Sequence, residues 1–273
     1  MKRYWTVIIL IIIIAAVFYF LPISINPSDI GHFFTFGKSN VTTLTSESVD
    51  LQDSISNIRM NSMSTNIYIS HGEKNTFSYK HDRKSTDFEY STDSGNFFLK
   101  EYGKGLLFNI GSFGSKEFRL TTMDLQKDVN VHSVSGEIFS EGISCENGIF
   151  GSTSGDIELK NFKAETAKFE SVSGEITVDS GDMKKVTVGT VSGDVRLYKV
   201  SSLQNININT TSGEVVITGL DLSKYKIIFS SVSGSLSAGD LGKIKSRGEI
   251  GSGEYTISIR TVSGDAKITS TSL

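Results

Sequence analysis

The chain has 273 residues, with 27 Lys and Arg against 30 Asp and Glu, and a formal net charge of −3. This balance argues against a nucleic-acid partner, because nucleic-acid-binding proteins normally carry a basic stripe or patch that contacts phosphates. The single cysteine, Cys145, excludes an intrachain disulfide framework and a thiolate metal cluster.

The first segment is apolar and long enough to cross a membrane. Residues 4–25 contain no charged side chain, and about 20 residues of helix span a hydrocarbon core of roughly 30 Å. Lys2 and Arg3 precede the segment, so the positive-inside rule predicts a cytoplasmic tip at 1–3 and an extracytoplasmic remainder. We expect an uncleaved signal anchor followed by a linker at 26–49. A cleaved signal peptide is the alternative, although the residues after Ala15 and Ala16 stay bulky and apolar.

One phrase, [Ser/Thr]-x-Ser-Gly-[Asp/Glu]-apolar, recurs seven times in the second half of the chain. A near-constant period of this size indicates stacked structural units. The glycines of the seven copies step by 19, 19, 19, 20, 21 and 30 residues: Gly136, Gly155, Gly174, Gly193, Gly213, Gly234 and Gly264.

The residues around each phrase form apolar columns. With the glycine as position 0, position −5 is apolar in all seven copies, and positions +2 and +4 are apolar with the exception of Ser140. The pattern predicts an all-β fold: a β-solenoid of 19–21-residue rungs, stacked in parallel and preceded by one transmembrane helix. We expect a corner between positions −5 and −2, where the inward parity slips, and the phrase itself on the strand that follows. An antiparallel sandwich is the alternative.

The solenoid domain is expected to cover residues 50–273, with regular rungs over 131–273 and degenerate rungs over 50–130. Gly95 lies 41 residues, about two periods, before Gly136 and is interpreted as part of such a degenerate rung. The charged run at 80–87 is interpreted as a solvated loop.

Six of the seven copies place an acid at position +1. A column of carboxylates raises the possibility of a calcium site. Two unit charges about 4.8 Å apart in water repel by only about 0.9 kcal/mol, so surface carboxylates tolerate this spacing without a cation. We therefore expect no metal and no cofactor, and keep the six as weak calcium candidates: Glu137, Asp156, Glu175, Asp194, Glu214 and Asp265.

No reactive constellation stands out, so no catalytic residue is predicted. His32, His71, His81 and His132 lack metal-ligand spacing and are expected at the surface. Arg196 beside Asp194 is the nearest approach to a glycan-cleaving arrangement.

The longest interval between copies contains a glycine-rich, locally basic segment at 240–254, with Lys243, Lys245 and Arg247. Insertions in repeat proteins often map to binding loops, which makes these three cations candidates for an interaction. We favour a cap that covers the open end of the stack.

The repeated Val-Ser-Gly-Asp/Glu phrase, the Val/Phe column before it, the N-terminal span and the loop that begins at Arg247 together resemble a bacterial family of unknown function. Its members are labelled as predicted adhesins and include LiaG-like membrane-anchored proteins of Gram-positive envelope-stress operons. The resemblance covers residues from about 50 to 273, and Ser235 departs from it by replacing the acid. It brings no catalytic residues.

We expect a non-enzymatic scaffold or interaction module of the cell envelope, linked to envelope stress, with envelope proteins or cell-wall polymers as partners. A surface adhesin for polysaccharide or protein is the alternative, and a wall-glycan-acting enzyme is a disfavoured third.

Overall fold

The structure is a computed structural model that describes residues 45–51, 54–81, 86–103, 116–123 and 125–270. The transmembrane anchor expected at 4–25 lies outside these residues. Within them, no helix is long and apolar enough to cross a membrane.

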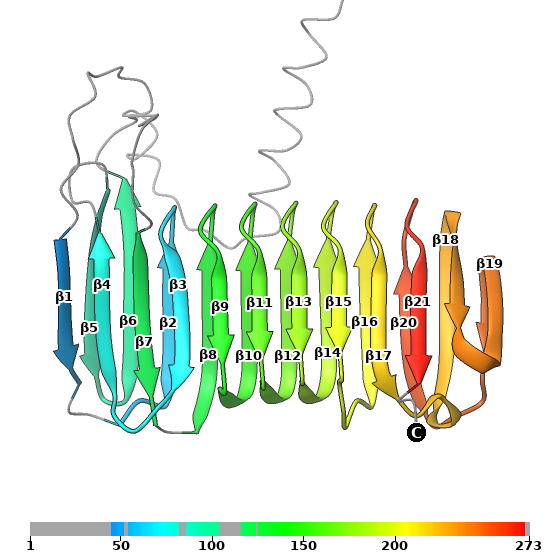
Figure 1. Ribbon diagram of the computed structural model, residues 1–273, viewed down its shortest axis with the longest axis horizontal. Coiled ribbons are helices and arrows are strands. Elements are labelled where there is room, and N and C mark those ends of the chain that lie inside the picture. Colours follow the sequence, from blue (N-terminus) through cyan, green and yellow to red (C-terminus); the bar gives the residue numbers. More distant parts are fainter. Residues whose placement is uncertain (1–44, 52–53, 82–85, 104–115, 124, 271–273) are drawn as a thin grey trace, which may run out of the picture.

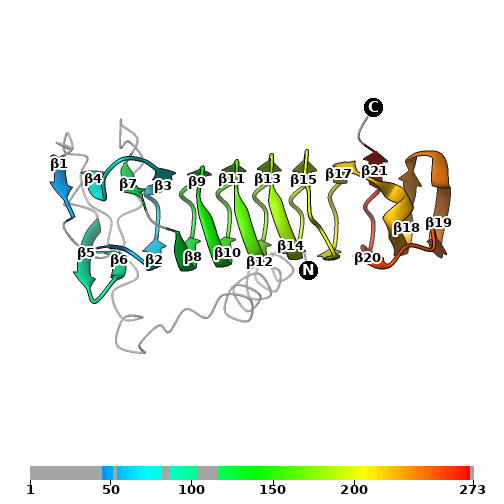
Figure 2. The same ribbon diagram turned by 90° about the horizontal axis from the view of Figure 1, so that it is seen from below.

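Parallel strands form two flat layers that face each other across a thin core (Figures 1 and 2). In the middle of the stack, each rung contributes one strand to the first layer and one strand to the second. The first-layer strands of the middle rungs are β8 (Gln126–Ser133), β10 (Ser144–Ser152), β12 (Lys163–Ser171), β14 (Asp182–Thr190) and β16 (Asn205–Thr210). Their second-layer partners are β9 (Ile138–Glu141), β11 (Ile157–Lys160), β13 (Ile176–Asp179), β15 (Val195–Tyr198) and β17 (Val215–Leu220).

The predicted inward columns are confirmed. Every residue at positions −5, +2 and +4 of the seven copies is buried, and even Ser140, the polar exception, is 1% exposed. Neighbouring rungs keep these columns in register: Phe150 pairs with Phe169, and Ile157 with Ile176. The rings of Phe150 and Phe169 stack with centroids 5.9 Å apart, so the core gains aromatic contact as well as buried area. The parallel pairing confirms the solenoid and excludes the antiparallel sandwich for this part of the chain.

The corner of each rung lies at the phrase itself, which corrects the expected position. β10 continues through Ser152 at position −3, and β11 starts at Ile157, position +2. Positions −2 to +1 therefore form the corner. The inward parity slips because the glycine occupies the inner side of the bend. A second turn closes the rung, with residues such as Asn161 at positive φ.

The stacking order departs from the sequence order at the C-terminal end. The last rung of the chain, β20 (Tyr255–Arg260) and β21 (Ala266–Ser270), pairs with β16 and β17. The preceding segment, β18 (Tyr225–Ala238), pairs with the outer side of β20 and β21. Figure 1 shows the last rung in red between the yellow and orange segments. The sequence predicted that consecutive copies of the phrase pair with each other, and this prediction is wrong at the C-terminal end.

The end of the stack is closed by an antiparallel strand. After the 3₁₀ turn η3 (Gly239–Leu241), β19 (Gly242–Ile250) runs back along β18. Ile244 of β19 is buried against the core. A further 3₁₀ turn, η2 (Leu222–Lys224), leads into β18. The 240–254 segment is thus a cap, as favoured from its sequence.

The N-terminal end also departs from sequence order. β2 (Asn57–Ser62) and β3 (Asn66–His71) form a rung that pairs directly with β8 and β9. β6 (Asn96–Gly103) and β7 (Glu117–Thr122) pair with the outer side of that rung. Three antiparallel strands finish this end: β4 (Thr76–His81) on β7, β5 (Thr86–Asp93) on β6, and β1 (Thr45–Asp50) on β4.

Gly95 directly precedes β6 of the outer rung but does not lie at a corner as Gly136 does: with Ser94 it forms the two-residue turn of the β5–β6 hairpin, and both residues have positive φ, as type I′ turns require. The run at 80–87 is not simply a solvated loop, because His81 ends β4 with no exposed surface and Thr86 begins β5. Aromatic side chains from β4 and β5 close the core here; the rings of Tyr79 and Phe88 lie 4.6 Å apart.

The exchanged order at the C-terminal end predicts which engineered cysteines can be joined. Thr211, Val262 and Val232 occupy position −2 in three consecutive layers of the stack, linked by backbone hydrogen bonds of 3.2 Å from Val262 to Thr211 and from Val232 to Val262. Adjacent rungs lie about 4.8 Å apart, within the range of a disulfide, whereas alternate rungs do not. In a Cys145→Ala background, we expect oxidation to join Thr211→Cys to Val262→Cys.

The matched control is Thr211→Cys with Val232→Cys, which should keep both thiols free by thiol titration. Disulfide formation by the control pair but not by the first pair would restore the sequence order and contradict the fold described above.

Candidate interaction surface

The corners of the rungs line up along one edge of the solenoid, and each position of the phrase forms a column there. In four copies, the hydroxyl at position −3 accepts a hydrogen bond from the backbone N–H of the glycine in its own rung: Ser171, Thr190, Ser231 and Thr261. The donor–acceptor distance is 2.8 Å for Gly174 to Ser171 and 3.0 Å for Gly193 to Thr190. This local bond shapes the bend and satisfies a backbone donor that no strand partner reaches.

The serine at position −1 links consecutive rungs. Its hydroxyl donates to the backbone carbonyl at position −2 of the preceding rung, at 3.3 Å both from Ser154 to Val134 and from Ser173 to Thr153. The same bond recurs at Ser135, Ser192 and Ser212. Ser at −1 thus joins rung to rung, whereas Ser or Thr at −3 closes the bend within a rung.

The six candidate calcium ligands, Glu137, Asp156, Glu175, Asp194, Glu214 and Asp265, lie in one column at position +1. In stacking order the column runs from Glu117 of the outer rung through Asn66 to Ser235, and short Asx residues alternate with Glu between these ends. The Asx oxygens accept hydrogen bonds from the backbone N–H of the next rung: Glu137 to Asn66 at 3.0 Å, Glu175 to Asp156 at 2.7 Å, Glu214 to Asp194 at 2.8 Å and Ser235 to Asp265 at 2.8 Å.

These contacts give the column a structural role. Arg196 forms ion pairs with Glu175 and with Asp194, the latter at 2.8 Å. The hydrogen bond from Arg196 lowers the pKa of Glu175, with Thr177 adding to the effect. Among the described residues, no three His, Cys, Asp or Glu side chains converge as metal ligands would. The carboxylates of the column accept hydrogen bonds from backbone N–H groups and from the guanidinium group of Arg196. The Arg196–Asp194 pair, the nearest approach to a glycan-cleaving arrangement, is part of this column.

The described residues contain an eighth copy of the phrase, which the sequence pattern did not predict. Register places Ser62 level with Ser133 and Ile67 level with Ile138, so Thr65 stands where the other rungs have glycine. The copy reads Ser62-Met-Ser-Thr-Asn-Ile67. Because Thr65 replaces the glycine, this copy does not match the phrase. The spacing of Ser62, Ser64 and Ile67 is the part of the phrase that the sequence retains.

Glu101 of β6 fills the corner beside Thr65. It occupies position −3 of the outer rung, where the other rungs have Ser or Thr, and its side chain reaches the neighbouring corner. Oε2 accepts hydrogen bonds from Ser62 Oγ at 2.8 Å and from the backbone N–H groups of Met63, Ser64 and Thr65 at 2.8, 3.1 and 3.3 Å. Oε1 accepts from Thr65 Oγ1 at 2.7 Å. One carboxylate thus accepts hydrogen bonds from all three consecutive backbone N–H groups of this corner.

His81 completes this buried cluster. Its Nε2 lies 3.1 Å from Glu101 Oε1 and 2.9 Å from Thr86 Oγ1, with neither the histidine nor the glutamate side chain exposed. Burial alone would raise the pKa of Glu101, but the hydrogen bonds from His81, Ser64, Thr65 and Met63 outweigh it and hold the pKa well below its usual range. The surface expectation for His81 is wrong because alternation along β4 points Phe77, Tyr79 and His81 inward together.

His132 is half-buried, and burial lowers its pKa; His71 is exposed, and His32 lies outside the described residues. Cys145 faces the core, where burial and then Asp128 raise the pKa of its thiol to about 12.

The three cations of the 240–254 segment, Lys243, Lys245 and Arg247, are exposed on β19 at the end of the stack. They are far from the carboxylate-lined middle of the corner column.

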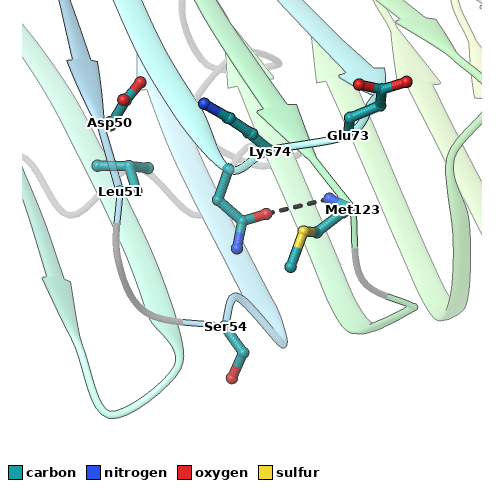
Figure 3. A pocket seen from close by; sticks show the side chains of 7 residues that line it. Asp50, Leu51, Ser54, Glu73, Lys74 and Met123 are labelled. Carbon is teal, nitrogen blue, oxygen red and sulfur yellow. Dashed lines mark hydrogen bonds between the residues drawn. The ribbon is translucent and has the colours of Figure 1, made fainter.

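A pocket of about 440 Å³ lies at the foot of the N-terminal rungs (Figure 3). Asp50, Leu51, Lys74 and Met123 are among its lining residues. Asn75 Oδ1 accepts a hydrogen bond of 3.0 Å from the backbone N–H of Met123, which ties two chain connections together. Ser54 and Glu73 also line it, and no side-chain hydrogen bond or ion pair joins the four described residues Asp50, Ser54, Glu73 and Lys74 to one another.

With two facing layers of parallel strands joined by a repeated corner, the molecule is a flat, rack-like β-solenoid. Residues 37–269 match the family model described as Toastrack DUF4097, and the chain belongs to this family.

The chain is similar to several solved structures. A predicted adhesin from Bacteroides fragilis is 12% identical, with 83% of this chain and 97% of that chain covered and a TM-score of 0.45. A predicted cell adhesion protein from Clostridium sporogenes is 13% identical over 84% and 100% of the two chains, with a TM-score of 0.34. A predicted adhesin from Parabacteroides distasonis is 10% identical over 84% and 98%, with a TM-score of 0.45. Comparison with curated proteins gives no match.

Proposed function

We propose that this protein is a membrane-anchored, extracytoplasmic, non-enzymatic scaffold or interaction module of the cell envelope, linked to envelope stress. The observation that carries the proposal is the use of polar groups along the corner edge. Serine hydroxyls, Asx oxygens and Glu101 are bound to backbone groups of their own or adjacent rungs. Such an arrangement builds a stiff rod with long outer faces, which suits a presenting surface better than a catalytic cleft.

The membrane part of the proposal rests on the sequence. The uncharged segment 4–25 follows Lys2 and Arg3, and by the positive-inside rule this order supports a solenoid outside the cytoplasm. The linker would be shorter than the expected 26–49, because β1 begins at Thr45, and residues 26–44 would separate the rod from the bilayer.

Cysteine labelling of intact cells tests this orientation. In a Cys145→Ala background, Val232→Cys offers a thiol at a site that is 77% exposed. A small membrane-impermeant maleimide should label it on intact cells, whereas a cysteine added ahead of Met1 should react only after permeabilisation. Labelling of both sites only after lysis would contradict the extracytoplasmic placement.

One observation favours the second candidate, an adhesin that binds polysaccharide. The outer face of the first layer carries asparagines on β2, β8, β10 and β16: Asn57, Asn130, Asn147, Asn205, Asn207 and Asn209. Three of them alternate along β16, where side chains on one face lie about 6.6 Å apart, and such amide groups can bind the hydroxyls of a glycan.

Retention of the full chain on purified wall polymers tests this candidate. We expect the exposed pair Asn205→Ala with Asn209→Ala to reduce retention at least tenfold. The matched control is Thr177→Ala on the outer face of the second layer, which should leave it unchanged. Equal retention of wild type and variants on wall polymers and on unrelated dextran would reject the adhesin.

A further inference from the structure

The two ends of the stack differ sharply in charge. β1 and β5, which form the N-terminal end, carry five acids and no Lys or Arg. The acids are Glu47, Asp50, Asp87, Glu89 and Asp93. β19, at the opposite end, carries three basic residues and one acid, and that acid, Glu249, forms an ion pair of 2.7 Å with Lys226 of β18. Within the described residues, Lys243, Lys245 and Arg247 form no ion pair with the chain itself.

Both ends also present open strand edges. Within the described residues, β1 pairs only with β4, β5 only with β6, and β19 only with β18. One edge of each strand therefore has backbone N–H and C=O groups available to another strand. Tyr90 of β5 is 36% exposed, and Ile250 of β19 is partly buried against the core, so apolar surface accompanies the polar edges.

We propose that the basic end, β19, binds the acidic end, β1 and β5, of a second copy of this chain. Opposite charges favour the meeting of unlike ends, and like charges disfavour the pairing of two acidic or two basic ends. A contact between different surfaces of identical chains is heterologous, so each added copy presents a new end, and the assembly is an open row of rods. The inference is independent of the ligand that the outer faces bind.

The alternative role of edge charges is to prevent association altogether, as lysines on edge strands do in many sheets. The separation of sign distinguishes the two roles: a purely protective edge gains nothing from acids at one end and bases at the other. Association driven by these charges must weaken with salt, because exposed charges are screened over about 8 Å at physiological ionic strength.

Sedimentation of the full chain in detergent micelles tests the association. At about 20 mM salt we expect a sedimentation coefficient that rises with protein concentration, and a monomer at 0.5 M salt. The triple variant Lys243→Glu, Lys245→Glu, Arg247→Glu should weaken association at least tenfold. Mixing this variant with Glu89→Lys, Asp93→Lys should restore association, because the charges again oppose. A monomer under all conditions, or association that ignores these changes, would overturn the proposal.

Cross-linking tests the orientation. Ser91 of β5 and Ser246 of β19 are exposed at opposite ends of one molecule, so a disulfide between them must join two chains. In a Cys145→Ala background, a mixture of Ser91→Cys and Ser246→Cys chains of different mass should give the mixed dimer in large excess over either homodimer. Predominance of the Ser91→Cys homodimer would show that like ends meet, and would reject the head-to-tail contact.

Discussion

Replacing Gly155 by alanine is expected to destabilise the protein by about 3 kcal/mol, the cost of forcing an extra group into a filled space. A Cβ on Gly155 would lie 2.1 Å from the carbonyl oxygen of Gly136 and 2.6 Å from its carbonyl carbon. These are backbone atoms of the adjacent rung, so no side-chain rotation relieves the contact. The free energy of unfolding, measured by denaturant titration followed by circular dichroism, gives the size of the effect.

Gly189 provides the matched control, because it lies in a strand of the same solenoid and a Cβ there meets nothing within 4 Å. Gly189→Ala should change the free energy of unfolding by no more than about 0.5 kcal/mol, since alanine also restricts the unfolded chain. Equal losses for the two variants would show that the close approach of the corners does not explain the glycine column.

Replacing Glu101 by glutamine is expected to cost about 3 kcal/mol of stability, because it removes the charge from a buried cluster built around it. Oε2 accepts four hydrogen bonds, three of them from consecutive backbone N–H groups. An amide nitrogen at the Oε2 position would direct its N–H groups at three backbone N–H donors. The neighbouring surface variant Glu89→Gln should lie within about 0.5 kcal/mol of wild type.

The same carboxylate predicts a dependence of stability on acid. Because the folded-state pKa of Glu101 is held below the unfolded value of about 4.3, its contribution is fully present above that value. The contribution disappears as pH falls through the folded pKa, since the protonated form binds the folded cluster less well. Denaturant midpoints between pH 7 and pH 3 should therefore fall more steeply for wild type than for Glu101→Gln. Parallel curves would contradict this role of Glu101.

The regular part of the fold was predictable because its rungs repeat without insertions. The steps of 19 or 20 residues between Gly136 and Gly213 determine which residues stack, and the −5, +2 and +4 columns are buried as predicted. The location of the corner was missed because the hydrophobic pattern shows a slip in parity but does not show which residue bends. The hydrogen bond from Gly174 to Ser171 identifies the bend only once the backbone is known.

The ends were not predictable from periodicity, because their neighbours are distant in sequence. Ser235 looked like a break in the acid column when copies were read in order. In stacking order it is the terminal residue, and it donates to Asp265 through both its backbone and its hydroxyl, at 2.8 and 3.0 Å. Glu101 likewise gave no signal, since its partners lie 36 to 39 residues away in a copy of the phrase that lacks glycine.

The inserted position of the last rung imposes an order on the biosynthesis of the protein. β18 pairs with the stack through β20 and β21, whose paired residues come 30 positions later in the chain, as in Tyr225–Tyr255 and Leu236–Ala266. During synthesis, residues 225–250 therefore lack this pairing partner until residues 255–270 have been made. A chain interrupted before residue 255 lacks the surface on which this end assembles and leaves the apolar edge of β16 and β17 uncovered. Closure of this end of the stack thus reports that translation has passed residue 270.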